Sequence, residues 1–166
     1  VYTPLKLITP LSVFVGAIPG ALPFMLGWVA ATGEIGIEAI MLFLMQFFWQ
    51  FPHFWSIGWM QNKDYENAGF KMLPTGKKDR STTSQILFYS IWAVLMSIIP
   101  AFNLTGDLSL SIYGLLLVLL IGLVLIYYAV KLFNDSTDLN AKKLMLVSVS
   151  YLTLMQIVLL FDKILR

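Results

Sequence analysis

The chain has 166 residues, of which 58% are hydrophobic and 12% are charged. Soluble domains average about 45–50% apolar and about 25% charged residues, so this composition is that of a membrane protein. The chain has no cysteine and one histidine, which excludes a disulfide framework, a thiolate nucleophile and a poly-histidine metal centre. A net charge of +2 is too small to indicate nucleic acid, and the partner that we expect is the lipid bilayer.

The chain begins at Val1, and no signal peptide with a charged segment and a short apolar stretch precedes the first span. We therefore expect the sequence to be cut from a longer protein.

Charged residues divide the chain into five stretches that contain no Asp, Glu, Lys or Arg. Each stretch is close to or longer than the roughly 20 residues that an α-helix needs to cross a bilayer. We predict an all-α integral membrane protein with five transmembrane helices. Their expected spans are 11–31, 36–60, 85–103, 109–133 and 144–161, within a single domain of residues 1–166.

Lysine and arginine are distributed unevenly between the two ends of the predicted helices. Nine of the 11 basic residues lie at one end of the predicted helices: before the first span, in the connection 61–84 or beside the fourth connection. The other two, Lys163 and Arg166, lie in the C-terminal tail. Cytoplasmic loops carry the excess of basic residues in membrane proteins. We therefore predict a cytoplasmic N-terminus, an outside C-terminus and a cytoplasmic, functional loop at 61–84.

The first predicted helix is rich in glycine and proline. Gly16 and Gly20 are spaced by four residues, which permits close approach of two membrane helices. Pro19 and Pro23 are expected to bend the same helix. Close helix packing is one interpretation, and a kink that opens a cavity is the other.

Polar side chains recur along one face of the second predicted helix. They are Gln46, Gln50, His53 and Ser56. Their spacings of four, three and three residues place them on one side of a helix that turns 100° per residue, and Asp64 shares this face if the helix continues. Such groups either face a cavity within the bundle or form hydrogen bonds to neighbouring helices.

Aromatic residues also crowd this helix, and a charged loop follows it. Aromatic faces such as that of Trp49 stabilise cations and suit a planar apolar ligand, although tryptophan is also common at membrane interfaces. In the loop, Asp64 is a hard oxygen ligand suited to Mg²⁺, and Lys63 offers a point charge for phosphates. The alternative is a solvated ion pair of little energetic consequence.

Several short segments together resemble a known family. They are Tyr2-Thr-Pro-Leu-Lys6, Gly16-x-x-x-Gly20-Ala-Leu-Pro23, Gly27-Trp28, Trp49-Gln-x-Pro-His53-Phe and Asp64-Tyr-x-x-Ala-Gly69-x-x-Met-Leu-Pro74. In combination they resemble the protoheme IX farnesyltransferase (heme O synthase) branch of the UbiA-type intramembrane prenyltransferases. The resemblance covers about the first half of the chain. It implies a nine-helix bundle around a central cavity, of which this chain resembles helices five to nine.

The resemblance implies transfer of farnesyl from farnesyl diphosphate to a vinyl group of heme b. It implies Mg²⁺ at Asp64 and catalytic roles for Asp64 and His53. The substrate-binding candidates are Lys6, Lys63, Trp49, Gln50 and Tyr65. For His53, ligation of the heme iron and handling of a proton or water both stay open.

The resemblance also implies a bacterial inner-membrane location and several partners. These are the missing N-terminal half of the same enzyme and a downstream heme A synthase. Three competing interpretations are a quinone or chlorophyll-type prenyltransferase, a transporter fragment and a non-catalytic membrane anchor. His53, preceded by Gln-x-Pro, favours heme over a quinone as the acceptor.

Overall fold

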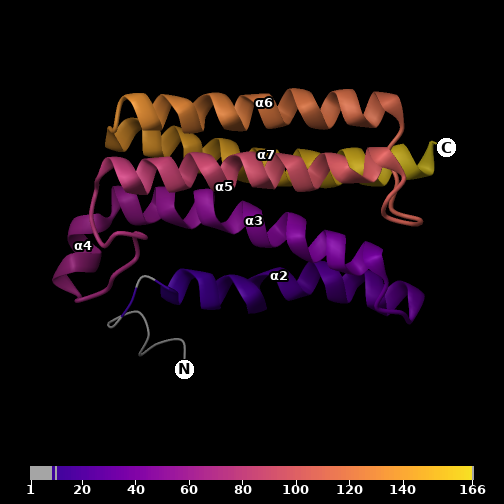
Figure 1. Cartoon of the computed structure of the whole chain (residues 1–166), viewed down its shortest axis with the longest axis horizontal. Helices are drawn as coiled ribbons and strands as arrows, with labels where there is room; N and C mark the ends of the chain where they lie inside the picture. Colours follow the sequence, from indigo (N-terminus) through magenta and orange to yellow (C-terminus); the bar gives the residue numbers. More distant parts are fainter. Residues whose placement is uncertain (1–8, 10, 166) are drawn as a thin grey trace.

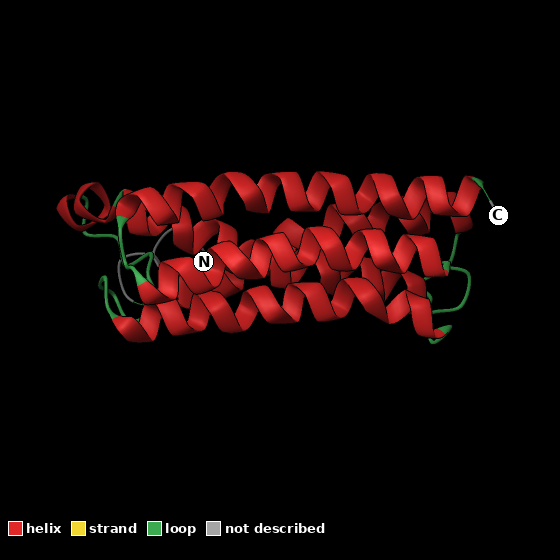
Figure 2. Ribbon diagram, turned by 90° about the horizontal axis from the view of Figure 1, so that it is seen from above, coloured by secondary structure: helices red, strands yellow, loops and turns green. Residues whose placement is uncertain are grey.

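Five long helices run side by side along one axis in the computed structural model, which describes residue 9 and residues 11–165 (Figure 1). They are α2 (Leu11–Thr32), α3 (Ile37–Met60), α5 (Arg80–Ile98), α6 (Ile112–Asn134) and α7 (Asp138–Ile164). A short helix α4 (Asn62–Asn67) follows α3, and a 3-10 turn η1 (Ile99–Phe102) extends α5. Seen from above, the helices stay nearly parallel, so the molecule is an elongated bundle (Figure 2).

The all-α fold with five long helices is confirmed, but two helices begin earlier than expected. The spans 85–103 and 144–161 correspond to helices that begin at Arg80 and Asp138. Caps explain both starts, because the Asp79 carboxylate accepts from the Thr82 N–H at 2.8 Å and the Thr137 hydroxyl accepts from the Asn140 N–H at 3.3 Å. The connection predicted at 61–84 is therefore 61–79, because α5 begins at Arg80.

Within the described residues, four helices are long and apolar enough to cross a membrane: α2, α5 with η1, α6 and α7. Helix α3 has 24 residues but is not among them. Its glutamines, histidine, proline and tryptophans lower its hydropathy. A membrane span for α3 stays a prediction, which its position at the centre of the bundle supports.

Helix α3 packs against α2, α5 and α7. Phe51 and Trp59 of α3 are almost fully buried, and so are Ala17 and Ala21 on the facing side of α2. Small side chains on α2 allow close approach to the bulky α3, although the buried ones are Ala17 and Ala21 and not the Gly16 and Gly20 of the predicted packing motif. Most side chains on the polar face of α3 are therefore enclosed by neighbouring helices.

The two ends of the bundle differ in chemistry. The loop 61–79 and the turn between α6 and α7 meet at one end, where Lys78 Nζ lies 2.6 Å from Asp138 Oδ1. At the opposite end, Glu38 accepts from the Asp107 N–H at 3.0 Å and Asp162 accepts from the Ser111 N–H at 2.9 Å. The connections with most of the basic residues therefore share one end, and the C-terminus lies at the other (Figure 1).

Candidate functional site

His53 and Trp49 lie one helical turn apart on α3, and both contact Ser148 of α7. The Trp49 indole N–H donates to the Ser148 backbone carbonyl at 2.6 Å. His53 Nδ1 lies 2.9 Å from Ser148 Oγ. The two rings are stacked, with centroids 4.7 Å apart and an angle of 15° between their planes. The hydrogen bond to Ser148 and the stacked Trp49 ring therefore hold the imidazole, and Trp49 is itself tied to Ser148.

These hydrogen bonds favour one tautomer of His53. The Ser148 hydroxyl donates to the Met145 carbonyl at 2.7 Å, and a hydroxyl has only one hydrogen to donate. With that hydrogen engaged at Met145, Ser148 Oγ accepts from His53 Nδ1. In the neutral ring this places the proton on Nδ1 and leaves a lone pair on Nε2, which can bind a metal or accept a proton.

Gln50 is buried and faces α2. Its amide Nε2 donates to the Ala17 carbonyl at 3.0 Å. A β-carbon on Gly20 would clash with Gln50 Oε1, so the glycine makes room for this side chain. The Gln50 hydrogen bond therefore fixes how α3 sits against α2.

A cleft of about 320 Å³ opens between α2 and α3 and extends to α4. Gln50 lines it from α3, Tyr65 lines it from α4, and Gly16 and Gly20 form its wall on α2. Two predicted substrate-binding residues thus share one cleft, which we call the α2–α3 cleft. On α2, Ala17 and Ala21 are the small residues buried against α3, whereas Gly16 and Gly20 border this cleft. A bend at Pro19 or Pro23 as the cause of the cleft stays a prediction.

The helix does not continue from His53 to Asp64, so the condition on which they would share a face is not met. Helix α3 ends at Met60, and Gln61 separates it from α4 with φ −99° and ψ 18°. His53 lies about 10 Å along the axis before that end. Asp64 and Lys63 are exposed on α4, at the end of the bundle.

The polar face of α3 is divided between neighbours and does not line one cavity. Gln50 bonds to α2 and His53 to α7, whereas Ser56 donates to the Pro52 carbonyl of its own helix at 2.6 Å. Gln46 is buried, and its Oε1 has no hydrogen-bond partner among the described residues. Of the four, Gln50 alone lines the α2–α3 cleft.

The residues near Asp64 fit Mg²⁺ only in part. Among the described residues, no three His, Cys, Asp or Glu side chains gather where they could hold a metal ion. Mg²⁺ is commonly held by one or two carboxylates together with substrate phosphates, so a single exposed Asp64 can supply one ligand. Lys6, a predicted diphosphate contact, lies outside the described residues.

Ser148 is the site residue that the sequence does not reveal. It lies in an apolar span where a serine ordinarily bonds to a carbonyl of its own helix. The only sequence signal is a hydroxyl within a membrane segment, which Ser150 carries equally. Only the packing of α7 on α3 distinguishes them, because Ser148 is buried against His53 and Ser150 is exposed.

Comparison with known proteins gives a consistent assignment. Residues 1–156 match the UbiA prenyltransferase family. The chain is 60% identical over its whole length to a protoheme IX farnesyltransferase of Flavobacterium johnsoniae and 58% identical to those of Flavobacterium psychrophilum and Christiangramia forsetii. It covers 55% of each relative, so it spans about half the length of the curated relatives that it matches.

No solved structure matches the chain. The family match nevertheless covers nearly all of the sequence, and 58–60% of the residues of this chain are identical in the three relatives. This chain therefore belongs to the UbiA prenyltransferase family.

Proposed function

We propose that this chain is the C-terminal portion of an enzyme that transfers farnesyl from farnesyl diphosphate to a vinyl group of heme b, forming heme O. The observation that carries the proposal is the identity of 58–60% to protoheme IX farnesyltransferases over the whole chain. The enzyme's other half, which the relatives contain, completes the site. Heme A synthase is the partner that would take the product.

His53 is the residue proposed to receive heme. Its Nε2 lone pair, left free by the bond between Nδ1 and Ser148, suits ligation of the heme iron. Trp49 stacks on the imidazole and holds its plane, so we assign it to positioning of His53. A quinone offers no metal for this lone pair, which favours heme as the acceptor.

The diphosphate is proposed to bind at the loop end of the bundle. Asp64 would hold Mg²⁺, which neutralises charge on the leaving diphosphate when bound. Lys63 and Lys6 would supply further positive charge, while Gln50 and Tyr65 border the α2–α3 cleft that accepts the apolar chain. By the distribution of basic residues, this end faces the cytoplasm of a bacterial inner membrane.

The chemistry then requires a site that separates charge and excludes water. The bond between C1 of farnesyl and the diphosphate oxygen breaks, and the allylic cation forms a bond to the vinyl carbon of heme. Water adds to the resulting cation and loses a proton, which leaves a hydroxyethylfarnesyl group. The apolar and aromatic walls around α3 limit premature capture of the cation by water.

The test is a heme titration of the full-length enzyme, followed by its visible absorption. If His53 binds iron, His53→Ala shifts or abolishes the heme band, and Ser148→Ala weakens heme binding about 10- to 100-fold, as for other residues that orient a metal ligand. Ser150→Ala is the matched control, because Ser150 is exposed and bonds only within its own helix. It should leave the spectrum unchanged.

A second variant separates the two halves of the proposal. Asp64→Asn should strongly reduce Mg²⁺-dependent diphosphate binding and heme O formation without moving the heme band.

If His53→Ala lowers product formation but leaves the heme spectrum intact, His53 handles a proton or water instead. If neither heme binding nor product formation responds to His53→Ala, the assignment of His53 to the site is wrong.

A further inference from the structure

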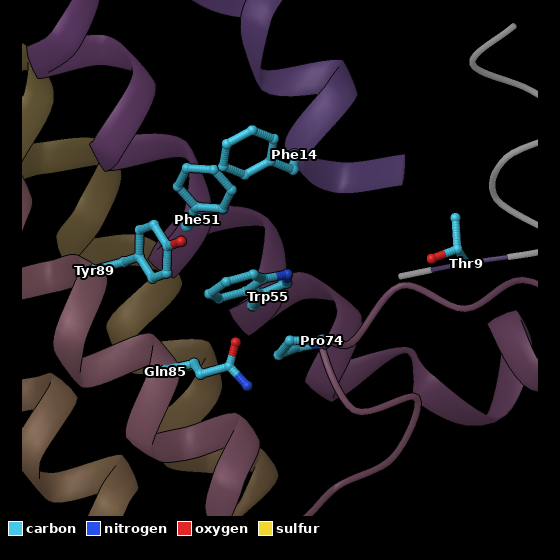
Figure 3. Close-up of a pocket in the computed structure, with 7 residues that line it drawn as sticks. All are labelled: Thr9, Phe14, Phe51, Trp55, Pro74, Gln85 and Tyr89. Carbon is cyan, nitrogen blue, oxygen red and sulfur yellow. The ribbon is translucent and has the colours of Figure 1, made fainter. Parts of the chain in front are cut away.

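A second cleft, of about 270 Å³, lies where α2, α3 and α5 meet beneath the loop 61–79 (Figure 3). Four aromatic rings form its walls: Phe14, Phe51, Trp55 and Tyr89. Trp55 lies about 160° around the axis of α3 from His53. We call this space the tryptophan cleft. It shares no lining residue with the α2–α3 cleft and does not include His53.

Trp55 brings an unsatisfied hydrogen-bond donor to this cleft. The side chain is 5% exposed, and its Nε1 has no hydrogen-bond partner among the described residues. Figure 3 shows the indole nitrogen directed toward the side of the cleft where Thr9 and Pro74 lie. Buried N–H groups are nearly always paired in folded proteins, so this donor indicates a missing acceptor.

The lining determines the kind of acceptor. None of the described residues that line the tryptophan cleft carries a charge, so nothing there compensates a phosphate or carboxylate. The carboxamide of Gln85 extends into the same space, and the lining also carries the neutral hydroxyls of Thr9 and Tyr89 (Figure 3). A neutral carbonyl oxygen on an apolar chain therefore fits best, because the rings contact the chain and the indole N–H pairs with the oxygen.

The depth of the cleft indicates where this carbonyl comes from. Trp55 lies five residues before the end of α3, about 8 Å along the helix axis. Tryptophan at this depth sits in the interfacial belt of a bilayer, next to the glycerol esters of the lipids. We propose that the tryptophan cleft binds an acyl ester of a membrane glycerolipid, whose carbonyl oxygen accepts the hydrogen bond of Trp55 Nε1.

The experiment compares two phospholipids that differ only in their two ester carbonyls, which the ether lipid lacks. The full-length protein is placed in nanodiscs of mixed diacyl and dialkyl-ether phosphatidylcholine of equal chain length, and bound lipid is measured by native mass spectrometry. Loss of one neutral hydrogen bond weakens binding about 2- to 12-fold, so the wild type should retain the diacyl lipid with that preference. A ratio of one in the wild type would overturn the proposal without any variant.

Two variants locate the preference. Trp55→Phe keeps the ring and removes the N–H, and it should abolish the preference for the diacyl lipid. Trp59→Phe is the matched control, because its indole N–H is also buried and unpaired among the described residues but does not line the tryptophan cleft. If the preference for the diacyl lipid survives Trp55→Phe, the lipid binds elsewhere. The same conclusion follows if Trp59→Phe abolishes the preference as fully as Trp55→Phe does.

The head group provides the last comparison. The preference for the diacyl over the dialkyl-ether lipid should be the same when both carry a phosphatidylglycerol head group, since the described lining carries no charge. A preference that appears only with the anionic head group would contradict recognition through the ester. Heme binding at His53 is measured in parallel, so failure of the lipid proposal is distinguishable from failure of the proposed function.

Discussion

Gly20 controls the contact between α2 and α3 at the scale of a single atom. The space that a β-carbon would fill is occupied by the Gln50 carboxamide, whose Nε2 bonds to Ala17. Any side chain at this position must push the carboxamide away. The residue therefore connects helix packing with the shape of the α2–α3 cleft.

Gly20→Ala should break the bond between Gln50 and Ala17, while Gly27→Ala in the same helix meets nothing within 4 Å. Both substitutions change helix propensity by the same amount. The difference in unfolding free energy between the two variants therefore measures the contribution of the hydrogen bond between Gln50 and Ala17. We expect Gly20→Ala to be about 1 kcal/mol less stable than Gly27→Ala. Unfolding in mixed detergent micelles measures this difference, and equal stabilities would contradict the structure.

At the scale of elements, the start of α5 depends on Asp79. Its carboxylate accepts from the Thr82 N–H, and the Thr82 hydroxyl donates to the Lys77 carbonyl at 3.0 Å. The bond from the Thr82 N–H holds the pKa of the Asp79 carboxyl below its usual value. One residue therefore ends the loop 61–79 and begins the helix that packs against α3.

Asp79→Ala should destabilise the protein by about 0.5–2 kcal/mol, as expected for loss of an N-cap. Because the folded pKa of Asp79 is lowered, its contribution is complete above the ordinary pKa of aspartate and is lost as the pH falls through the folded value. Asp79→Ser keeps the cap but does not titrate. Thermal unfolding between pH 3 and 7 should therefore show a larger loss at acid pH in the wild type than in Asp79→Ser.

At the scale of the whole molecule, the ends of the bundle carry different charge, which predicts its orientation in the membrane. Lys77 lies in the loop at the basic end, and Leu104 is exposed at the opposite end. The chain has no cysteine, so an introduced one can be labelled without background from these residues. Cysteine at position 77 should react with an impermeant thiol reagent only from the cytoplasmic side, and cysteine at 104 only from outside.

The reverse labelling pattern would place Asp64 on the outer face. A donor diphosphate made in the cytosol would then not reach it directly, and the proposed role of Asp64 would fail together with the orientation.

The sequence alone determined the helical bundle and the family. An uncharged stretch of about 20 residues predicts a membrane helix, because its side chains transfer favourably from water to lipid. This preference does not depend on which helices become neighbours. The motifs around Pro52 and Gly69 are also local in the sequence, so they can be recognised without a structure. The predicted helix starts at residues 85 and 144 are wrong, because the helices begin at Arg80 and Asp138, where charged residues beyond the apolar stretch still extend a capped helix.

Only the tertiary structure decided how the polar residues of α3 are used. A spacing of three and four residues defines a face, but the face meets α2 at Gln50 and α7 at His53. The proton on His53 Nδ1 depends on Ser148, which lies 95 residues away in the sequence. The Trp55 N–H, which has no partner in the part of the chain that the structure describes, is likewise defined by what surrounds it. Hydrogen bonds between distant helices are set by packing, and no local pattern encodes them.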